Sequence, residues 1–278
     1  MKRLAKYIRY LRKRIKHDRR AFIAYSVLRF FVMATAVRQL FMGHIESFGI
    51  CMLTLALLLV PSLMEDHFQI EIPPFFEVTI YLFIFAAEIL GEVNHFYVAI
   101  PGWDTMLHTI NGFLCAAIGF SLVDLLNRHS NQINLSPFYL ALTAFCFSMT
   151  VGVVWEFIEC AADLYLNQDM QKDFIVSSFQ SVSLDPTSSQ QIVEVRDITK
   201  TIIYTATGEY TIDGGYLDIG ILDTMKDLFV NFLGAIVFCT CGYIYAMQRG
   251  RHQGKRARIA EGFMVRVAIK QGELLDEG

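Results

Sequence analysis

The chain has 278 residues, of which 54% are apolar and only 18% are charged. Ten of its 24 Lys and Arg residues lie within residues 1–20 and seven within 249–278, which leaves seven for the 228 residues between. An ordinary soluble domain carries about 25% charged residues. This composition therefore excludes a soluble globule, a disordered chain and a nucleic-acid-binding protein, and it indicates an apolar region between two basic ends.

The apolar region is long enough to cross a membrane several times. A bilayer core of about 30 Å needs about 20 helical residues. The second of the predicted spans is short and ends near Pro61, and the first carries Arg29 and Arg38. The sequence predicts an all-α polytopic bundle with six transmembrane helices at about 21–42, 48–64, 75–95, 104–126, 137–162 and 223–247.

The basic ends predict the orientation of the bundle. Lys and Arg are enriched on the cytoplasmic side of membrane proteins, so both the arm, residues 1–20, and the tail, residues 248–278, are expected in the cytoplasm. An even number of spans fits this. The arm could also lie on the anionic leaflet as an amphipathic helix. The membrane domain is then residues 21–247.

One long polar loop, residues 163–222, is predicted outside the cytoplasm, and its nine acidic residues against three basic ones agree with that side. Within it, residues 199–213 alternate polar and apolar side chains around Gly208. Such alternation around a glycine predicts a β-hairpin, which would either cap the bundle or form a solvent-exposed connector.

Ionisable side chains recur at helical spacing in the third and fourth spans. Glu88, Glu92 and His95 stand at i, i+4 and i+7, so an α-helix would place them on one face, although His95 also fits a loop. Asp104 and His108 stand one turn apart at the start of the fourth span. Ionisable groups inside membrane helices are costly and indicate a functional site.

The fifth and sixth spans carry further acids. Glu156 and Glu159 lie near the end of the fifth, and Asp223 and Asp227 lie at the start of the sixth, with Asn231 one turn later. Because alternate spans run in opposite directions, all four groups of polar residues are expected at the same depth, near the outer surface. The sequence therefore predicts one outward-facing Asp/Glu/His site.

So many carboxylates cannot all be ionised side by side without a cation or shared protons. Carboxylates with imidazole suit a divalent metal such as Mg²⁺, Mn²⁺ or Zn²⁺. We predict Glu156 and His108 as catalytic groups, with Glu156 as general base. The predicted metal ligands are Asp104, His108, Glu156, Glu159, Asp223 and Asp227, and the surrounding polar residues are Glu88, Glu92, Asn111 and Asn231.

Three functions are compatible with such a site. The first is a metal-dependent enzyme that acts on an envelope lipid or a lipid-linked substrate at the outer leaflet. The second is a proton- or cation-coupled transporter, and the third is a non-catalytic envelope or partner-binding protein. In the third case Asp104 and Asp223 would be helix N-caps, and Asn111 and Asn231 would form interhelical hydrogen bonds.

The motifs resemble a family of uncharacterised bacterial membrane-spanning proteins that is defined as a domain of unknown function. This resemblance implies a bacterial plasma-membrane protein and brings no activity with it. More distantly, the Asp-x-x-x-His at the start of one span resembles VanZ-like proteins, which are linked to glycopeptide resistance. The residues that carry the first resemblance are Leu90-Gly91-Glu92, residues 103–108 with Asn111-Gly112, residues 155–159, and residues 220–227 with 231–235.

Overall fold

The computed structural model describes residues 19–68, 70–129, 135–248, 263 and 266–267. The chain divides into two compact units, residues 1–152 with 230–278 and residues 153–229. The predicted basic arm lies outside the described residues except at Arg19 and Arg20, as does most of the predicted tail. Each unit is described by itself.

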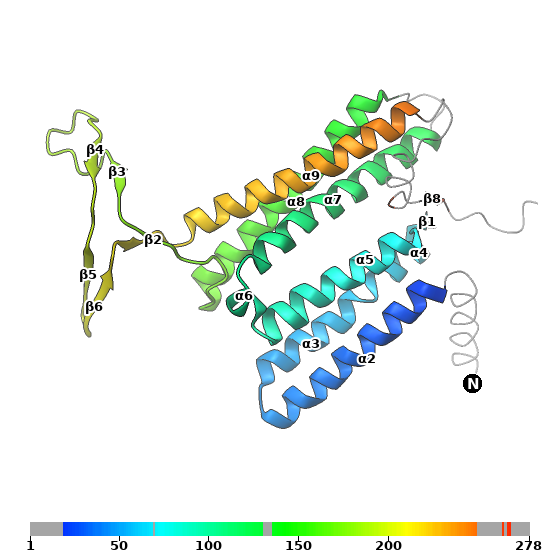
Figure 1. Cartoon of the computed structure of the whole chain (residues 1–278), viewed down its shortest axis with the longest axis horizontal. Helices are drawn as coiled ribbons and strands as arrows, with labels where there is room; N and C mark the ends of the chain where they lie inside the picture. Colours follow the sequence, from blue (N-terminus) through cyan, green and yellow to red (C-terminus); the bar gives the residue numbers. More distant parts are fainter. Residues whose placement is uncertain (1–18, 69, 130–134, 249–262, 264–265, 268–278) are drawn as a thin grey trace, which may run out of the picture. The chain divides into compact units, whose positions relative to one another are not determined.

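The first unit is helical. Figure 1 shows α2, α3 and α5 side by side, and their buried side chains form an apolar cluster around Val32, Leu58 and Tyr81. The helices that lie wholly or partly in this unit are α2 (Arg19–Met42), α3 (Ile45–Leu57), α4 (Val60–Phe68), α5 (Pro74–Ile84), the π-helix η1 (Phe85–Val93), α6 (Phe96–Ala99), α7 (Trp103–His129), α8 (Pro137–Leu166) and α9 (Ile221–Gln248).

Six helical stretches are long and apolar enough to cross a membrane, which confirms the predicted polytopic all-α fold. Their bounds differ most in the second span, which extends over Ile45–His67. The helix is interrupted at Leu58 and resumes at Val60, so Pro61 falls in the first turn of α4. Proline is tolerated there because it lacks only an N–H group that would have no helical partner. It therefore restarts the helix instead of ending the span.

The third span becomes a π-helix in its second half. The shared face expected for Glu88, Glu92 and His95 assumed an α-helix, whereas η1 is wound with i→i+5 hydrogen bonds. His95 lies beyond η1 in the left-handed conformation, with a φ of 59°. The side-chain amide of Asn94 donates to the carbonyl oxygen of Ile89 at 2.6 Å and closes the end of the π-helix.

Glycine permits close packing of α7 against α9 in the first unit. A Cβ atom on Gly112 would lie 2.0 Å from the carbonyl oxygen of Asn231, and one on Gly234 would lie 2.0 Å from that of Thr109. Further along both helices, Gly242 of α9 packs closely against the ring of Phe120 of α7. The two helices therefore run in the same direction with their backbones touching, an arrangement that small residues allow in membranes.

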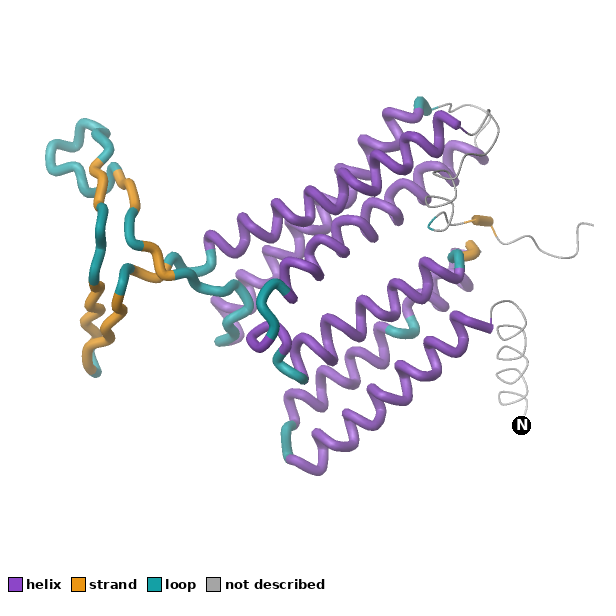
Figure 2. Tube along the Cα trace, viewed as in Figure 1, coloured by secondary structure: helices purple, strands orange, loops and turns teal. Residues whose placement is uncertain are grey.

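The second unit contains the end of α8, the start of α9 and the loop between them. Figure 2 shows that the described strands outside β1 and β8 all lie in this loop. They pair in antiparallel fashion as β2 with β7, β3 with β4, and β5 with β6. Their bounds are Ile175–Val176 (β2), Phe179–Ser181 (β3), Val193–Val195 (β4), Lys200–Thr205 (β5), Gly208–Asp213 (β6) and Tyr216–Leu217 (β7).

Strands β5 and β6 form the predicted hairpin. Six residue pairs face each other from Lys200 with Asp213 to Thr205 with Gly208. The hydroxyl of Thr205 accepts a hydrogen bond from the N–H group of Gly208 at 3.1 Å and donates to its carbonyl oxygen. The alternating pattern thus predicted this element correctly.

A separate turn is organised by the exposed carboxylate of Asp185. It accepts hydrogen bonds from the backbone N–H groups of Thr187, Ser189 and Gln191 at 2.9–3.0 Å. The hydroxyl of Thr187 and these N–H groups hold the pKa of Asp185 well below its usual range. The turn is held by the charged form.

We expect the Asp185 carboxyl to titrate below the value of about 3.9 that is typical of aspartate. Because the folded pKa is lowered, the turn should keep its stabilisation at neutral pH and lose it only as the pH falls through the folded pKa. Carboxyl ¹³C shifts followed against pH would measure this. A midpoint for Asp185 at or above about 3.9 would contradict it.

Candidate functional site

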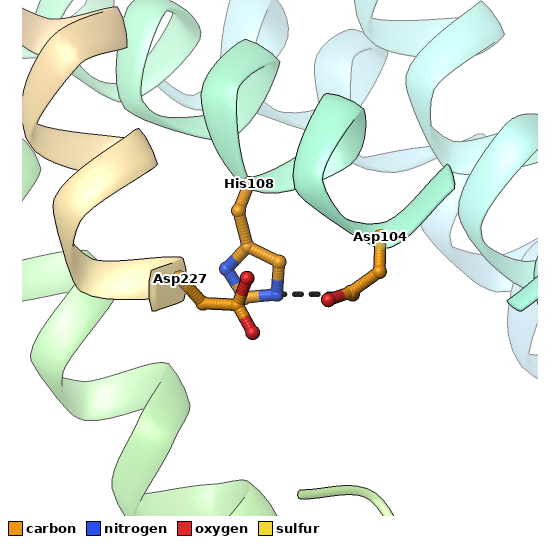
Figure 3. A group of neighbouring side chains, drawn as sticks. All are labelled: Asp104, His108 and Asp227. Atoms are coloured by element: carbon orange, nitrogen blue, oxygen red, sulfur yellow. Dashed lines mark ion pairs between the residues drawn. The ribbon is translucent and has the colours of Figure 1, made fainter. Parts of the chain in front are cut away.

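The start of α7 carries the first part of the site. Asp104 and His108 face the same side of the helix, and the His108 Nε2 atom lies 3.4 Å from the Asp104 Oδ1 atom (Figure 3). His108 is buried at 8% exposure. The pair follows from the i, i+4 spacing in an α-helix. A carboxylate beside a buried imidazole orients the ring for proton transfer or metal binding.

One turn further along α7, the first unit contains a buried network of polar side chains. The Asn111 amide nitrogen donates to the Asn231 Oδ1 atom at 3.2 Å, and Asn231 is fully buried. The Asn231 amide nitrogen lies 3.5 Å from the carbonyl oxygen of Ser148, whose hydroxyl donates to the carbonyl oxygen of Gly112. These bonds tie α7, α8 and α9 together at one level, so the interhelical interpretation of Asn111 and Asn231 is supported.

In the second unit, the start of α9 carries a compact ion-pair cluster. The Lys226 ammonium group lies 2.7 Å from the Asp223 Oδ1 atom and 3.6 Å from the Asp227 Oδ1 atom. The other oxygen of Asp223 accepts the backbone N–H group of Lys172 at 2.8 Å. Asp223 therefore fixes the preceding loop to the helix. The N–H group of Leu222 in the first turn of α9 donates to the carboxylate of Asp218.

The end of α8 supplies two more buried carboxylates, Glu156 and Glu159, at 4% and 8% exposure. The indole nitrogen of Trp155 donates to Glu159 at 2.7 Å. Asp163, one turn later, accepts the backbone N–H groups of Met170 and Gln171. Asp163 thus holds the loop, whereas Glu156 and Glu159 are buried in the helix before it.

Two groups of side chains, one in each unit, offer the ligand types that a divalent ion needs. Asp104 and His108 form the group of the first unit (Figure 3), and Glu156, Glu159 and Asp227 form that of the second. These are five of the six predicted metal ligands. The sixth, Asp223, also lies in the second unit, and its oxygens contact Lys226 and the N–H group of Lys172.

The two glutamates of the third span are also outside these groups. Glu88 is half-buried within η1, and Glu92 is exposed. The turn of a π-helix directs them differently from the α-helix that the spacing suggested. The structure thus leaves them as separate polar positions in the first unit.

Sequence reasoning did not assign a role to Lys226. Its ammonium group contacts two of the predicted ligands, Asp223 and Asp227. Its i+3 spacing from Asp223 could have predicted their ion pair, because residues three apart lie on the same helix surface. The loop backbone at Lys172 had no such signal, since 51 positions separate it from Asp223.

A family described as predicted membrane protein (DUF2238) matches residues 20–248. The chain belongs to this family. Its matched region contains all six candidate spans and every predicted site residue, and the family description carries no activity. No curated protein and no solved structure matches the chain. The predicted likeness to VanZ-like proteins is not among these findings.

Proposed function

We propose that this membrane protein binds a divalent metal ion through Asp104, His108, Glu156, Glu159 and Asp227. The observation that carries the proposal is the burial of its acidic ligands. In the second unit, Glu156, Glu159, Asp223 and Asp227 are all less than 9% exposed, and the Lys226 ammonium group lies 2.7 Å from Asp223 and 3.6 Å from Asp227. Buried carboxylates stay ionised only where cations compensate their charge, and a bound divalent ion supplies such compensation.

The loop beside these helices shows the same crowding of acids. Partial burial first, and then the carboxylates of Asp169, Asp218 and Asp163, raise the pKa of Asp173. Lys172 lowers it, and the acids outweigh that effect. A further cation in this region would be favoured electrostatically.

Helix continuity supports the choice of ligands. Within the first unit, Asn231 of α9 contacts Asn111 of α7, and both helices run in the same direction. His108 precedes Asn111 by three residues and Asp227 precedes Asn231 by four. An unbroken helix carries each residue about one turn, or 5.4 Å, further along the same side. The register of α7 and α9 therefore favours a shared level for His108 and Asp227.

The same register extends to α8. A Cβ atom on Gly152 would lie 2.8 Å from the side-chain nitrogen of Asn231, and Glu156 follows Gly152 by one turn in α8. Carboxylates with one imidazole are a ligand set typical of Mg²⁺, Mn²⁺ or Zn²⁺.

We infer an enzyme that acts on a lipid or lipid-linked substrate near the outer membrane surface, with both termini in the cytoplasm. The inference rests on the position of the acids at the ends of membrane helices. A bound divalent ion would polarise a phosphoryl or carbonyl oxygen. Glu156 would take a proton from the attacking water, and Asp104 would orient the His108 imidazole.

Metal analysis of the purified protein tests this proposal. We expect about one or two divalent ions per chain by elemental analysis, because the proposed ligands are four carboxylates and one imidazole. Asp104→Ala, His108→Ala and Asp227→Asn should each weaken metal binding at least about tenfold, since loss of an outer-shell partner alone typically costs about 10–100-fold in metal affinity. Glu209→Gln, on the exposed hairpin, is the matched control and should retain it.

Two outcomes contradict the proposal. Full metal content in all three ligand variants would show that the ion is bound elsewhere. A metal-free protein whose thermal midpoint does not rise with added Mg²⁺, Mn²⁺ or Zn²⁺ would show that the acid cluster is structural, since a ligand that binds the folded state must stabilise it.

A further inference from the structure

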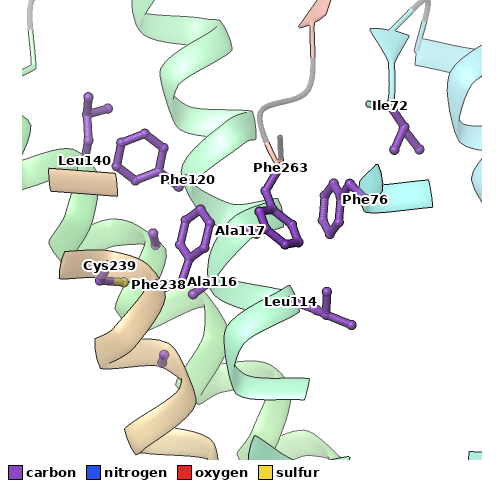
Figure 4. Packing of buried hydrophobic residues seen from close by; sticks show 12 residues of the cluster. Ile72, Phe76, Leu114, Ala116, Ala117, Phe120, Leu140, Phe238, Cys239 and Phe263 are labelled. Carbon is purple, nitrogen blue, oxygen red and sulfur yellow. The ribbon is translucent and has the colours of Figure 1, made fainter. Parts of the chain in front are cut away.

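The hairpin of β5 and β6 in the second unit presents aromatic and aliphatic side chains to solvent. Tyr204 and Tyr210 are 77% and 61% exposed, and Ile202 and Ile203 are 41% and 44% exposed. In the first unit, by contrast, the ring of Phe263 and its phenylalanine neighbours lie in a buried cluster (Figure 4). Exposed apolar surface that is grouped on one element is typical of interaction sites. The hairpin therefore has surface that a partner can bury.

Both edges of the hairpin are free in the part of the chain that the structure describes. Strands β5 and β6 pair with each other, and β1 (Ile70–Glu71) and β8 (Arg266–Val267) form a separate pair in the first unit. An isolated two-stranded hairpin is only marginally stable in water, and three or more strands are needed for independent stability. Addition of strands at an edge would therefore stabilise this hairpin.

The hydrogen-bond pattern of the hairpin decides which backbone groups lie on its edges. The N–H group of Gly214 donates to the carbonyl oxygen of Thr199 at 2.8 Å, so these two residues form a hydrogen-bonded pair. Bonded and non-bonded pairs alternate along an antiparallel ladder. The N–H and C=O groups on the outer edge of β5 are therefore those of Lys200, Ile202 and Tyr204.

The outer edge of β5 lacks the features that usually protect a free edge. Natural proteins block unwanted pairing at such edges with charged residues, prolines or β-bulges. Between Thr201 and Thr205 the strand has no charged residue and no proline, and its register with β6 is unbroken over six residue pairs. Its one charged residue, Lys200, stands at its start. The edge is therefore open to pairing with another strand.

We propose that this edge is a dimer interface, at which β5 pairs in antiparallel fashion with β5 of a second copy of this chain. Closed two-fold symmetry requires the same patch on both copies. A two-fold axis at Ile202 places this residue opposite its own counterpart, and it places Lys200 opposite Tyr204 of the second copy. About six backbone hydrogen bonds then join the two hairpins into a four-stranded sheet. The proposal is independent of the metal site.

Charge complementarity favours β5 over β6 for this contact. Tyr204 faces Glu209 across the hairpin, so Lys200 of one copy approaches the negative charge of the other. The corresponding pairing of β6 with itself, at full overlap of the strands, would place Glu209 opposite Asp213 twice. Like charges that are directly opposed destabilise a sheet. A second copy that pairs through β5 therefore fits the charges of the hairpin.

Energy transfer between fluorescently labelled full chains in phosphatidylcholine vesicles tests the interface. Transfer should rise with the protein-to-lipid ratio and saturate as expected for a dimer. Ile202→Pro removes an N–H group from the outer edge and spares the bonds between β5 and β6, so it should weaken association at least about tenfold. Thr211→Pro is the matched control, because Thr211 is the cross-strand partner of Ile202 and lies on the outer edge of β6. It should change association by less than about twofold.

Three results would overturn the proposal. A parent chain that stays monomeric at every protein-to-lipid ratio has no such interface. A dimer that persists unchanged in the Ile202→Pro chain is held by other elements, such as the membrane helices. Weakening by Thr211→Pro that equals or exceeds the effect of Ile202→Pro would mean that the β6 edge takes part in the contact.

Disulfide trapping tests the register without weakening the contact. The six native cysteines are replaced by alanine, and Ile202→Cys is then introduced into both copies. The Cα atoms of a hydrogen-bonded antiparallel pair lie about 5.5 Å apart, which is within disulfide reach. Oxidation should link this chain at least about tenfold faster than the Thr211→Cys chain, whose new thiol would lie on the same face but at the other edge. Equal rates would indicate random collision and would contradict the proposed pairing.

Discussion

Replacing Gly234 with alanine is expected to destabilise the bundle by about 3 kcal/mol or more. Adding atoms to a well-packed core typically costs about 1–3 kcal/mol in the free energy of unfolding, and this site is expected at or above the top of that range. A Cβ atom at this position would lie 2.0 Å from the carbonyl oxygen of Thr109 and 3.0 Å from the backbone nitrogen of Phe113. Both are backbone atoms of α7, so no side-chain rotation can relieve the overlap. The two helices would have to separate, which would weaken the hydrogen bond between Asn111 and Asn231.

The matched control is Gly49→Ala. Gly49 also lies inside a membrane helix, but a Cβ atom there would meet nothing within 4 Å. Alanine is a better helix former than glycine by about 1 kcal/mol, so this variant should be as stable as the parent or slightly more stable. Unfolding of both proteins in mixed micelles by denaturant would measure the difference. Equal midpoints for the two variants would mean that α7 and α9 do not pack in this register.

Replacing Lys226 with methionine is expected to cost about 2 kcal/mol. Loss of one partner from a buried ion pair typically costs about 3–5 kcal/mol, and the Lys226 side chain is 37% exposed, which reduces the effect through solvent screening. Among the described residues, the N–H group of Lys172 would remain as a partner of Asp223. Methionine retains the length of the lysine side chain, so the change removes mainly the charge.

Two further variants separate charge from packing. Lys226→Arg keeps the positive charge and should recover most of the lost stability. Combining Lys226→Met with Asp223→Asn removes both charges and should be less destabilised than Lys226→Met alone, as a double-mutant cycle would show. A Lys226→Met chain as stable as the parent at every pH would show that the ammonium group does not stabilise the buried negative charge of Asp223.

The spans and the hairpin could be predicted because their causes are local. Twenty consecutive apolar residues need a membrane or a large core whatever their neighbours are, and an alternating pattern around Gly208 specifies a hairpin within a few residues. The i, i+4 spacing of Asp104 and His108 likewise fixed their contact, since it depends only on α-helical geometry.

The π-helix and the helix restart at Pro61 could not be predicted in the same way. A change from i→i+4 to i→i+5 bonding leaves no sharp mark in composition, and here it occurs in the stretch that carries Glu88 and Glu92. Proline ends one helix and begins another equally well. Which of the two occurs at Pro61 depends on the residues around it in three dimensions.

The sequence by itself determined a six-span membrane protein with an excess of acids over basic groups between its ends, because apolar length and charge are properties of composition. Only the tertiary structure decided which acids already have partners. Asp223 is bonded to Lys226 and to the backbone at Lys172, which no spacing rule connects to it. It also decided that Phe263 lies within the core, since contacts across more than 140 positions depend on packing and not on local pattern.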